Sequence, residues 1–126
     1  MTGKPEVWFE KGQKDVEMAK RAMGPSAPLP DMACYHAQQC AEKYLKGYLV
    51  SHQIEFRWVH DLVYLVQLCR EQDSQFESLM EAVDVLNVYS TQVRYPAEDM
   101  SEPSPKDAHQ AIQMTEHIAQ FVENRI

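Results

Sequence analysis

The segment DMACYHAQQCAEKYLKGYLVSH, residues 31–52, decides the fold of this 126-residue chain. Its apolar residues recur at helical spacing and form one broad stripe. At 1.5 Å per residue the helix would be roughly 30 Å long, long enough to cross a whole domain. We therefore predict a central helix over Asp31–His52, with Asp31 as its N-terminal cap. Its opposite face is polar and is expected to be solvated by default; it consists of Gln38, Gln39, Glu42, Lys43 and Lys46.

The remainder of the chain shows the same helical spacing. On the N-terminal side, Lys4–Met23 predicts a first helix, and the proline-rich segment Gly24–Pro30 predicts a loop. On the C-terminal side we expect, in order, a link over Gln53–Val59, a third helix that starts near His60-Asp61 and carries Leu62–Cys69, a fourth helix over Phe76–Val93, a loop over Tyr95–Pro105 and a last helix that begins at Pro105 or Lys106 with Ser104 as its cap.

The predicted fold class is all-α, an up-and-down bundle of about five helices in a single domain over residues 1–126. Most of the large side chains are expected in the core. These include Trp8, Phe9, Trp58, Met80 and Tyr89, with the inward positions of the last helix at Ala108, Ala111, Ile112, Thr115, Ile118, Ala119 and Val122.

The charge balance limits the partners of the chain. There are 12 Lys plus Arg residues against 19 Asp plus Glu, a net charge of −7 at pH 7 with neutral His. Broad nucleic-acid binding is disfavoured, because it draws on many Lys and Arg contacts to phosphate. No apolar run approaches the ~20 residues that cross a bilayer, and no leader opens the chain. We therefore expect a cytoplasmic protein without a membrane contact.

Common metal and cofactor motifs are missing from the sequence. Cys34, Cys40 and Cys69 form no C-x-x-C pair and lie in apolar stretches, which is typical of buried free thiols. The histidines are spread over separate elements, without Glu-x-x-His or H-E-x-x-H spacing. Glycine-rich phosphate loops and the G-x-S-x-G elbow are also missing. We expect no metal and no cofactor, so any site must be built from helix faces.

Three blocks, in order along the chain, carry a family resemblance. They are Ala33-Cys34-Tyr35-His36-Ala37-Gln38-Gln39-Cys40-Ala41-Glu42-Lys43-Tyr44-Leu45-Lys46, then His60-Asp61-Leu62, then Val93-Arg94-Tyr95-Pro96. Together they span about residues 5–125, and over this length the chain resembles the HEPN domain family. The resemblance implies a small helical bundle similar to the helical domain beside the catalytic domain of aminoglycoside nucleotidyltransferases, in a bacterial or archaeal protein.

The resemblance also implies partners and a function. Such proteins are often paired with a separately encoded minimal nucleotidyltransferase, in toxin-antitoxin or stress-defence modules, and they usually form homodimers. We therefore expect a homodimeric protein that binds a nucleotide or pairs with such an enzyme. A purely structural interaction protein without a small ligand is the alternative.

An enzymatic alternative is also open. Some branches of the family are metal-independent ribonucleases that use an Arg and a His separated by four to six residues at a dimer interface. Here Arg57 and His60 have two residues between them, and Arg94 and His109 have fourteen. The plain motif is therefore not present, and the ribonuclease hypothesis requires Arg94 to meet His109 or His36 in space.

The ligand-binding hypothesis assigns five residues. His36, Gln39 and Lys43 would face a cleft from the central helix, while Arg94 and Tyr95 would close one end by holding a phosphate and a base. Each assignment has a structural alternative. His36 would be a buried, hydrogen-bonded histidine, Gln39 and Lys43 a solvated helix face, and Arg94 a partner for the last carbonyls of its helix.

Overall fold

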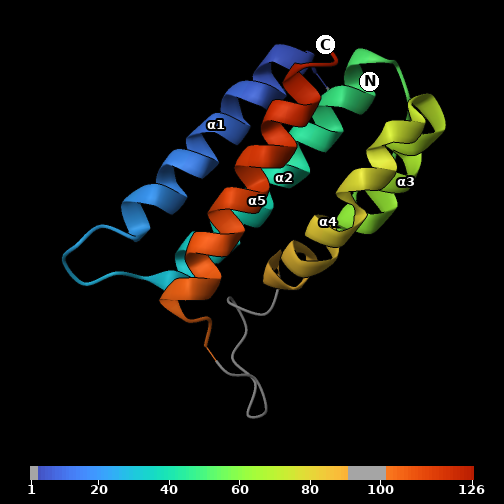
Figure 1. Ribbon diagram of the computed structural model, residues 1–126. Coiled ribbons are helices and arrows are strands. Elements are labelled where there is room, and N and C mark those ends of the chain that lie inside the picture. The colour runs from blue at the N-terminus through green and yellow to red at the C-terminus, as the bar shows by residue number, and fades with distance from the viewer. Residues whose placement is uncertain (1–2, 91–101) are drawn as a thin grey trace.

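The computed structural model describes residues 3–90 and 102–126, which fold into helices without any strand. Figure 1 shows α5 in front of α2, with α1 on one side and α3 and α4 on the other. The elements are α1 (Pro5–Ala22), α2 (Pro30–Ser51), α3 (Leu62–Gln72), the 3₁₀ helix η1 (Ser74–Leu79), α4 (Met80–Leu86), the 3₁₀ helix η2 (Asn87–Ser90) and α5 (Pro105–Glu123). The prediction of an all-α bundle of about five helices is confirmed.

Helix α2 is the central element of the bundle. It packs against α1 and α5 over most of its length and also contacts α3 and α4. Its apolar stripe is buried, with Tyr44 and Leu45 fully removed from solvent. The predicted inward residues of α5 are buried as well. The hydrophobic core therefore lies around α2, because every other helix turns its apolar face towards it.

Two glycines set the close approach of α1 to α2. A Cβ atom on Gly47 of α2 would lie 2.5 Å from the ring of Phe9, and one on Gly12 of α1 would lie 2.8 Å from the ring of Tyr44. Neither position has room for a methyl group, so each glycine lets an aromatic ring of the facing helix lie against its backbone. This close contact also brings side chains of α1 within reach of those of α2, such as Asp15 and Lys43.

The link between α2 and α3 returns along α2. The carbonyl oxygen of His60 accepts a hydrogen bond from Gln38 Nε2 at 3.3 Å, and further along α3 the Cys69 thiol donates to the Leu45 carbonyl oxygen at 3.8 Å. Helices α2 and α3 therefore run in the same direction, and the predicted up-and-down order is wrong for this pair because the link returns along α2. Residues 53–61 consequently cover part of α2 that the sequence pattern leaves open to water.

The starts of the helices agree with the sequence in two of three cases. Asp61 caps α3 by accepting from the backbone of Val63 and Tyr64, and Ser104 caps α5 within a capping box completed by Asp107. The predicted cap Asp31 is wrong. Helix α2 begins one residue earlier, at Pro30, because proline is well suited to the first helical position, and Asp31 lies in the first turn.

The predicted continuous fourth helix over Phe76–Val93 is also wrong. The chain forms η1, then α4, then η2 in this region, and residues 91–93 lie outside the described part. Asp73 explains the early start, because its carboxylate accepts from the Gln75 amide and fixes a tight turn before Phe76. Phe76 remains fully buried, so the apolar pattern is satisfied by a tighter helix.

The three cysteines are free and buried, as expected. Most of the large side chains lie in or against the core, but the prediction fails for both tryptophans: Trp58 is 71% exposed, and Trp8 is half-buried and lies outside the core cluster. Among the described helices, none combines the length and the hydropathy that a membrane span requires.

Candidate functional site

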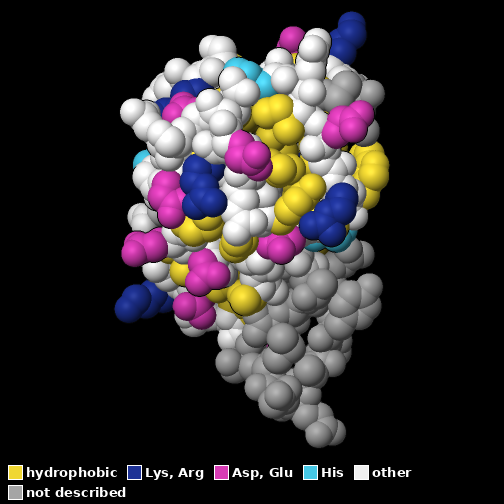
Figure 2. Space-filling model, turned by 90° about the vertical axis from the view of Figure 1, so that its right-hand side faces the viewer, with side chains coloured by type: hydrophobic (Ala, Val, Ile, Leu, Met, Phe, Trp, Pro, Cys, Tyr) yellow, Lys and Arg dark blue, Asp and Glu magenta, His cyan; other side chains and the backbone are white. Residues whose placement is uncertain are grey.

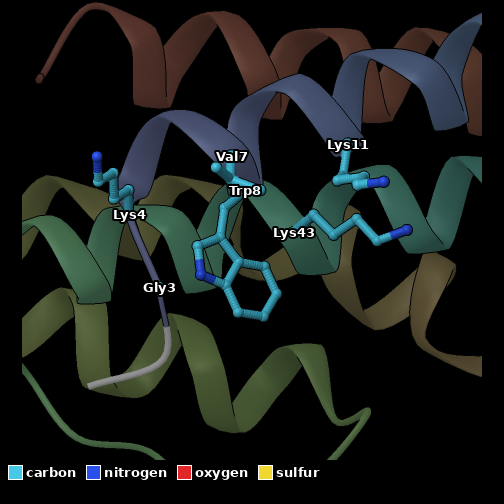
Figure 3. A pocket seen from close by; sticks show the side chains of 6 residues that line it. All are labelled: Gly3, Lys4, Val7, Trp8, Lys11 and Lys43. Carbon is cyan, nitrogen blue, oxygen red and sulfur yellow. The ribbon is translucent and has the colours of Figure 1, made fainter.

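A pocket of about 260 Å³ opens at the first turns of α1, where they face α2. Its lining consists of Gly3, Lys4, Val7, Trp8, Lys11 and Lys43. Figure 3 shows the Trp8 indole between α1 and α2, with the side chains of Lys11 and Lys43 extending to the same side of the ring and that of Lys4 at its opposite side. The wall of the pocket is thus almost wholly apolar and consists of one aromatic ring and the aliphatic stems of three lysines, whose ammonium groups lie at its rim.

Helical spacing explains why these residues share one face. Lys4 precedes α1, and Trp8 and Lys11 follow at intervals of four and three residues, which places all three on the same side of the helix. Lys43 reaches the pocket from α2 because the α1–α2 contact is close. The chain therefore gathers three cations on this face despite its net charge of −7.

Asp15 holds Lys43 at the edge of the pocket. One carboxylate oxygen of Asp15 accepts a hydrogen bond from Lys43 Nζ, and the other lies 2.9 Å from His36 Nδ1. The Asp15 side chain is only 10% exposed, and those of Lys43 and His36 are 26% and 21% exposed. Asp15 is thus a nearly buried anion with a fixed position between two groups of α2.

The other two lysines of the pocket are differently placed. Lys4 and Lys11 are exposed, and neither forms an ion pair with a carboxylate of residues 3–90 or 102–126. With Asp15 included, the site carries a formal charge of about +2, from three lysines and one carboxylate. An anion at the rim of the pocket would meet two open ammonium groups and a third that is shared with Asp15.

Trp8 also belongs to a second cluster. The ammonium group of Lys46 lies 6.0 Å from the Trp8 ring, 5.7 Å from Phe56 and 5.3 Å from Trp58. The three rings are within 6.3 to 6.4 Å of one another. Contacts of a cation with aromatic faces at these distances are attractive, so the cluster fixes the indole that forms the pocket wall.

The predicted solvated face of α2 is wrong for three of its residues. Gln38, Glu42 and Lys46 are buried, with exposed fractions of 0%, 4% and 2%. Glu42 accepts from Lys46 Nζ at 3.0 Å and lies 3.0 Å from His60 Nδ1. The physical reason is the returning link, because residues 53–61 lay Phe56, Trp58 and His60 over these polar side chains.

Of the residues predicted to bind a ligand, Lys43 lines the pocket. His36 lies beside it through Asp15 and contacts Tyr35 edge-to-face, while Gln39 donates to Gln38 Oε1 at 2.7 Å. Arg94 and Tyr95 lie outside the described residues.

The other residues considered for a ribonuclease site, His109, Arg57 and His60, do not line this pocket. His109 is exposed on the second turn of α5. The Arg57 guanidinium lies 4.5 Å from the centre of the Tyr64 ring, and His60 is held by Glu42. Within residues 3–90 and 102–126, no three His, Cys, Asp or Glu side chains come together as a group that could hold a metal ion.

Four residues at this site are not predicted as site residues by the sequence pattern: Lys4, Trp8, Lys11 and Asp15. Their spacing of four, three and four residues is a recognisable signal, because it places a cation, an aromatic ring, a cation and an anion on one helix face. The apolar neighbours of Trp8 concealed this signal, since a tryptophan in an apolar helix is usually a core residue.

Comparisons with known proteins agree with one another. The model of the HEPN domain family matches residues 5–125. The crystal structure of TT1696 from Thermus thermophilus is similar, with a TM-score of 0.79 and 26% identity over 97% of this chain and 98% of that chain. ST0689, described as an archaeal HEPN homologue, gives a TM-score of 0.79 and 26% identity over 98% of both chains. No curated protein sequence matches the chain.

Proposed function

The chain belongs to the HEPN domain family, and we propose that it binds a nucleotide in the pocket formed by Trp8 and Lys4, Lys11 and Lys43. The single observation that supports this proposal is one apolar pocket with an aromatic wall and with the ammonium groups of three lysines at its rim. A nucleotide offers the two complementary parts, a flat base and a phosphate, within one small molecule.

The aromatic wall is suited to a base. Bases stack on tryptophan with little regard to their identity, and such a contact contributes on the order of 1–3 kcal/mol in single-stranded nucleic-acid complexes. Trp8 is held by its contacts with Lys46, Phe56 and Trp58, so little side-chain entropy would be lost on stacking. This rigidity favours binding at the exposed part of the ring.

The ammonium groups are suited to a phosphate. Lys11 and Lys43 extend to the same side of the indole, so one phosphate group beside the ring would lie near both. Lysine binds phosphate as a point charge, which tolerates several orientations of the ligand. A few fixed cations suffice for one nucleotide, in contrast to the long positive surface that polynucleotides require.

A thermal-shift series tests this proposal. AMP, GMP, ADP, ATP and GTP are added to the purified protein in EDTA and, separately, with magnesium, because a ligand that binds only the folded state raises the melting temperature. We expect a concentration-dependent rise in wild type and in Lys106→Gln, a lysine variant at the start of α5. We expect at least half of it to be lost in Lys43→Gln. Equal shifts in both variants would contradict the site.

The family resemblance leads us to propose protein partners as well. In this proposal the protein forms a homodimer and acts with a minimal nucleotidyltransferase in a toxin-antitoxin or stress-defence module. Hydrophobic side chains gather among charged ones on the face that carries α3 and α4 (Figure 2), where Val85 and Val88 are 40% and 49% exposed. Exposed apolar side chains of this kind support a protein contact.

Sedimentation equilibrium tests the homodimer. We expect twice the monomer mass of 14.6 kDa for wild type and a shift towards monomer for Val85→Glu/Val88→Glu, because two buried charges would oppose association. A monomeric wild type at all concentrations would contradict the homodimer. Co-expression with a nucleotidyltransferase encoded beside this protein, followed by affinity purification, tests the second partner.

A further inference from the structure

Asp15 is placed where it acts on any ligand of Lys43. Asp15 does not line the pocket itself, but its carboxylate forms an ion pair with the ammonium group of Lys43, whose side chain does. Its other oxygen contacts His36, so it is tied to α2 at two positions two helical turns apart. The carboxylate has little freedom to move aside, because its side chain is only 10% exposed.

We infer that Asp15 is a built-in competitor for the anionic group of the ligand and restricts the pocket to ligands of low negative charge, such as a nucleoside monophosphate. This inference rests on the proposed function, because it concerns the same pocket. A phosphate that approaches Lys43 shares that ammonium group with a fixed carboxylate. Each additional negative charge on the ligand therefore meets repulsion that a site of lysines alone would not contain.

The charges of the site agree with this limit. Three lysines and one carboxylate give about +2 at neutral pH, and a phosphate monoester carries about −2. A nucleoside triphosphate brings about two further negative charges, for which the described residues of the pocket provide no further cation. The preferred ligand is thus a monophosphate, and magnesium would relieve part of the discrimination against a triphosphate.

The variant Asp15→Asn tests this inference, because asparagine keeps the shape of the side chain and one acceptor oxygen but removes its charge. Dissociation constants for AMP and ATP are measured by calorimetry in EDTA, for wild type and variant. We expect the affinity for AMP to rise about threefold and that for ATP about tenfold, because the gain increases with ligand charge. The charge-matched control is Glu10→Gln, an exposed carboxylate of α1, for which we expect less than a twofold change.

If Asp15 instead serves to position Lys43 for the ligand, the affinity for both nucleotides is expected to fall in Asp15→Asn. If Asp15→Asn weakens both ligands, or strengthens them equally, the inference is overturned while nucleotide binding stands. Circular dichroism and the melting temperature establish that the variant is folded, and Asp15→Ser provides a second neutral side chain with the same expected direction.

Inorganic phosphate and pyrophosphate separate the inference from the proposed function. If these anions bind and Asp15→Asn strengthens pyrophosphate more than phosphate, while nucleotides bind no better than the inorganic anions, the inference stands and the proposed function fails. If wild type and variant bind neither anions nor nucleotides, both are overturned.

Discussion

The ammonium group of Lys46 lies 3.0 Å from Glu42 Oε2, and the two side chains are only 3% and 6% exposed. This ion pair spans one turn of the central helix beneath the link of residues 53–61. Removing two charges from water is costly unless each is paired and hydrogen-bonded. Here Gln38 and His60 contact the Glu42 carboxylate, and three aromatic rings surround Lys46. Loss of either charge alone would therefore leave the other buried without its oppositely charged partner.

Replacement of one partner of this pair is predicted to be strongly destabilising. Lys46→Met leaves the Glu42 carboxylate buried without its ammonium partner, and we expect the free energy of unfolding to fall by about 3 kcal/mol. The double variant Glu42→Gln/Lys46→Met is expected to recover at least half of that loss, because no unpaired charge remains. Urea unfolding measures all three proteins. A double variant less stable than Lys46→Met would contradict this explanation.

The close contact of α1 and α2 predicts a cost for a single methyl group. Gly47→Ala would place its Cβ 2.5 Å from the Phe9 ring, so we expect a loss of about 1–3 kcal/mol from overpacking, although alanine favours helix formation. The control is Gly47→Ala/Phe9→Leu, where the smaller side chain gives the methyl group room. The stability of both variants is measured by thermal unfolding. A Gly47→Ala variant more stable than wild type would contradict this prediction, because it would show that α1 and α2 separate without cost.

The capping box of α5 predicts a smaller effect. Ser104 accepts from the Asp107 amide at 3.1 Å, and the Asp107 carboxylate accepts from the Ser104 amide at 3.0 Å. We expect Ser104→Ala to lower the free energy of unfolding by about 1 kcal/mol. Ser78→Ala, at an exposed position of η1, is the control and should change it by less than about 0.5 kcal/mol. The same result for both variants would mean that the cap contributes nothing.

The buried thiols predict loss of stability in alkali. Burial raises the pKa of the Cys34 thiol to about 11 and that of Cys40 to about 12, from an ordinary value of 9.0. The native state thus retains protons that the unfolded chain releases above pH 9. The associated stability is fully present below pH 9 and is lost as the pH rises towards 11–12.

The measurement is urea unfolding at several pH values from 8 to about 10.5. Each thiol contributes a fall in unfolding free energy of up to about 1.4 kcal/mol per pH unit. Cys40→Ala should show a shallower fall than wild type, whatever its stability at pH 8. Parallel curves for the two proteins would contradict a raised pKa at Cys40.

The sequence pattern predicts the fold well because the helices are strongly periodic. The stripe of α2 and the inward positions of α5 need only helical spacing, and both agree with the structure. The same pattern does not predict the cap of α2 or the form of the fourth helix. Pro30 and Asp73 set these features locally, and their effect overrides a broad apolar pattern. The periodicity of a segment does not show which of several helical forms its backbone adopts.

The site is less accessible from sequence because it depends on contacts between distant segments. The burial of Glu42 and Lys46 follows from the path of residues 53–61, which no spacing within α2 indicates. Asp15 and Lys43 meet only because glycines allow α1 and α2 to lie close together. The sequence pattern predicts Lys43 as a candidate, whereas its aromatic and anionic neighbours require the three-dimensional arrangement.

The fluorescence of Trp8 tests the central claim most directly. In Trp58→Phe, Trp8 is the only tryptophan, so its emission reports on the pocket wall alone. Titration with AMP in EDTA is predicted to quench this emission with saturation, because the base stacks on the indole, and Lys43→Gln in the same background should weaken the apparent affinity at least fivefold. Unchanged Trp8 emission at millimolar AMP, in a protein that is folded by circular dichroism, would contradict nucleotide binding at this site.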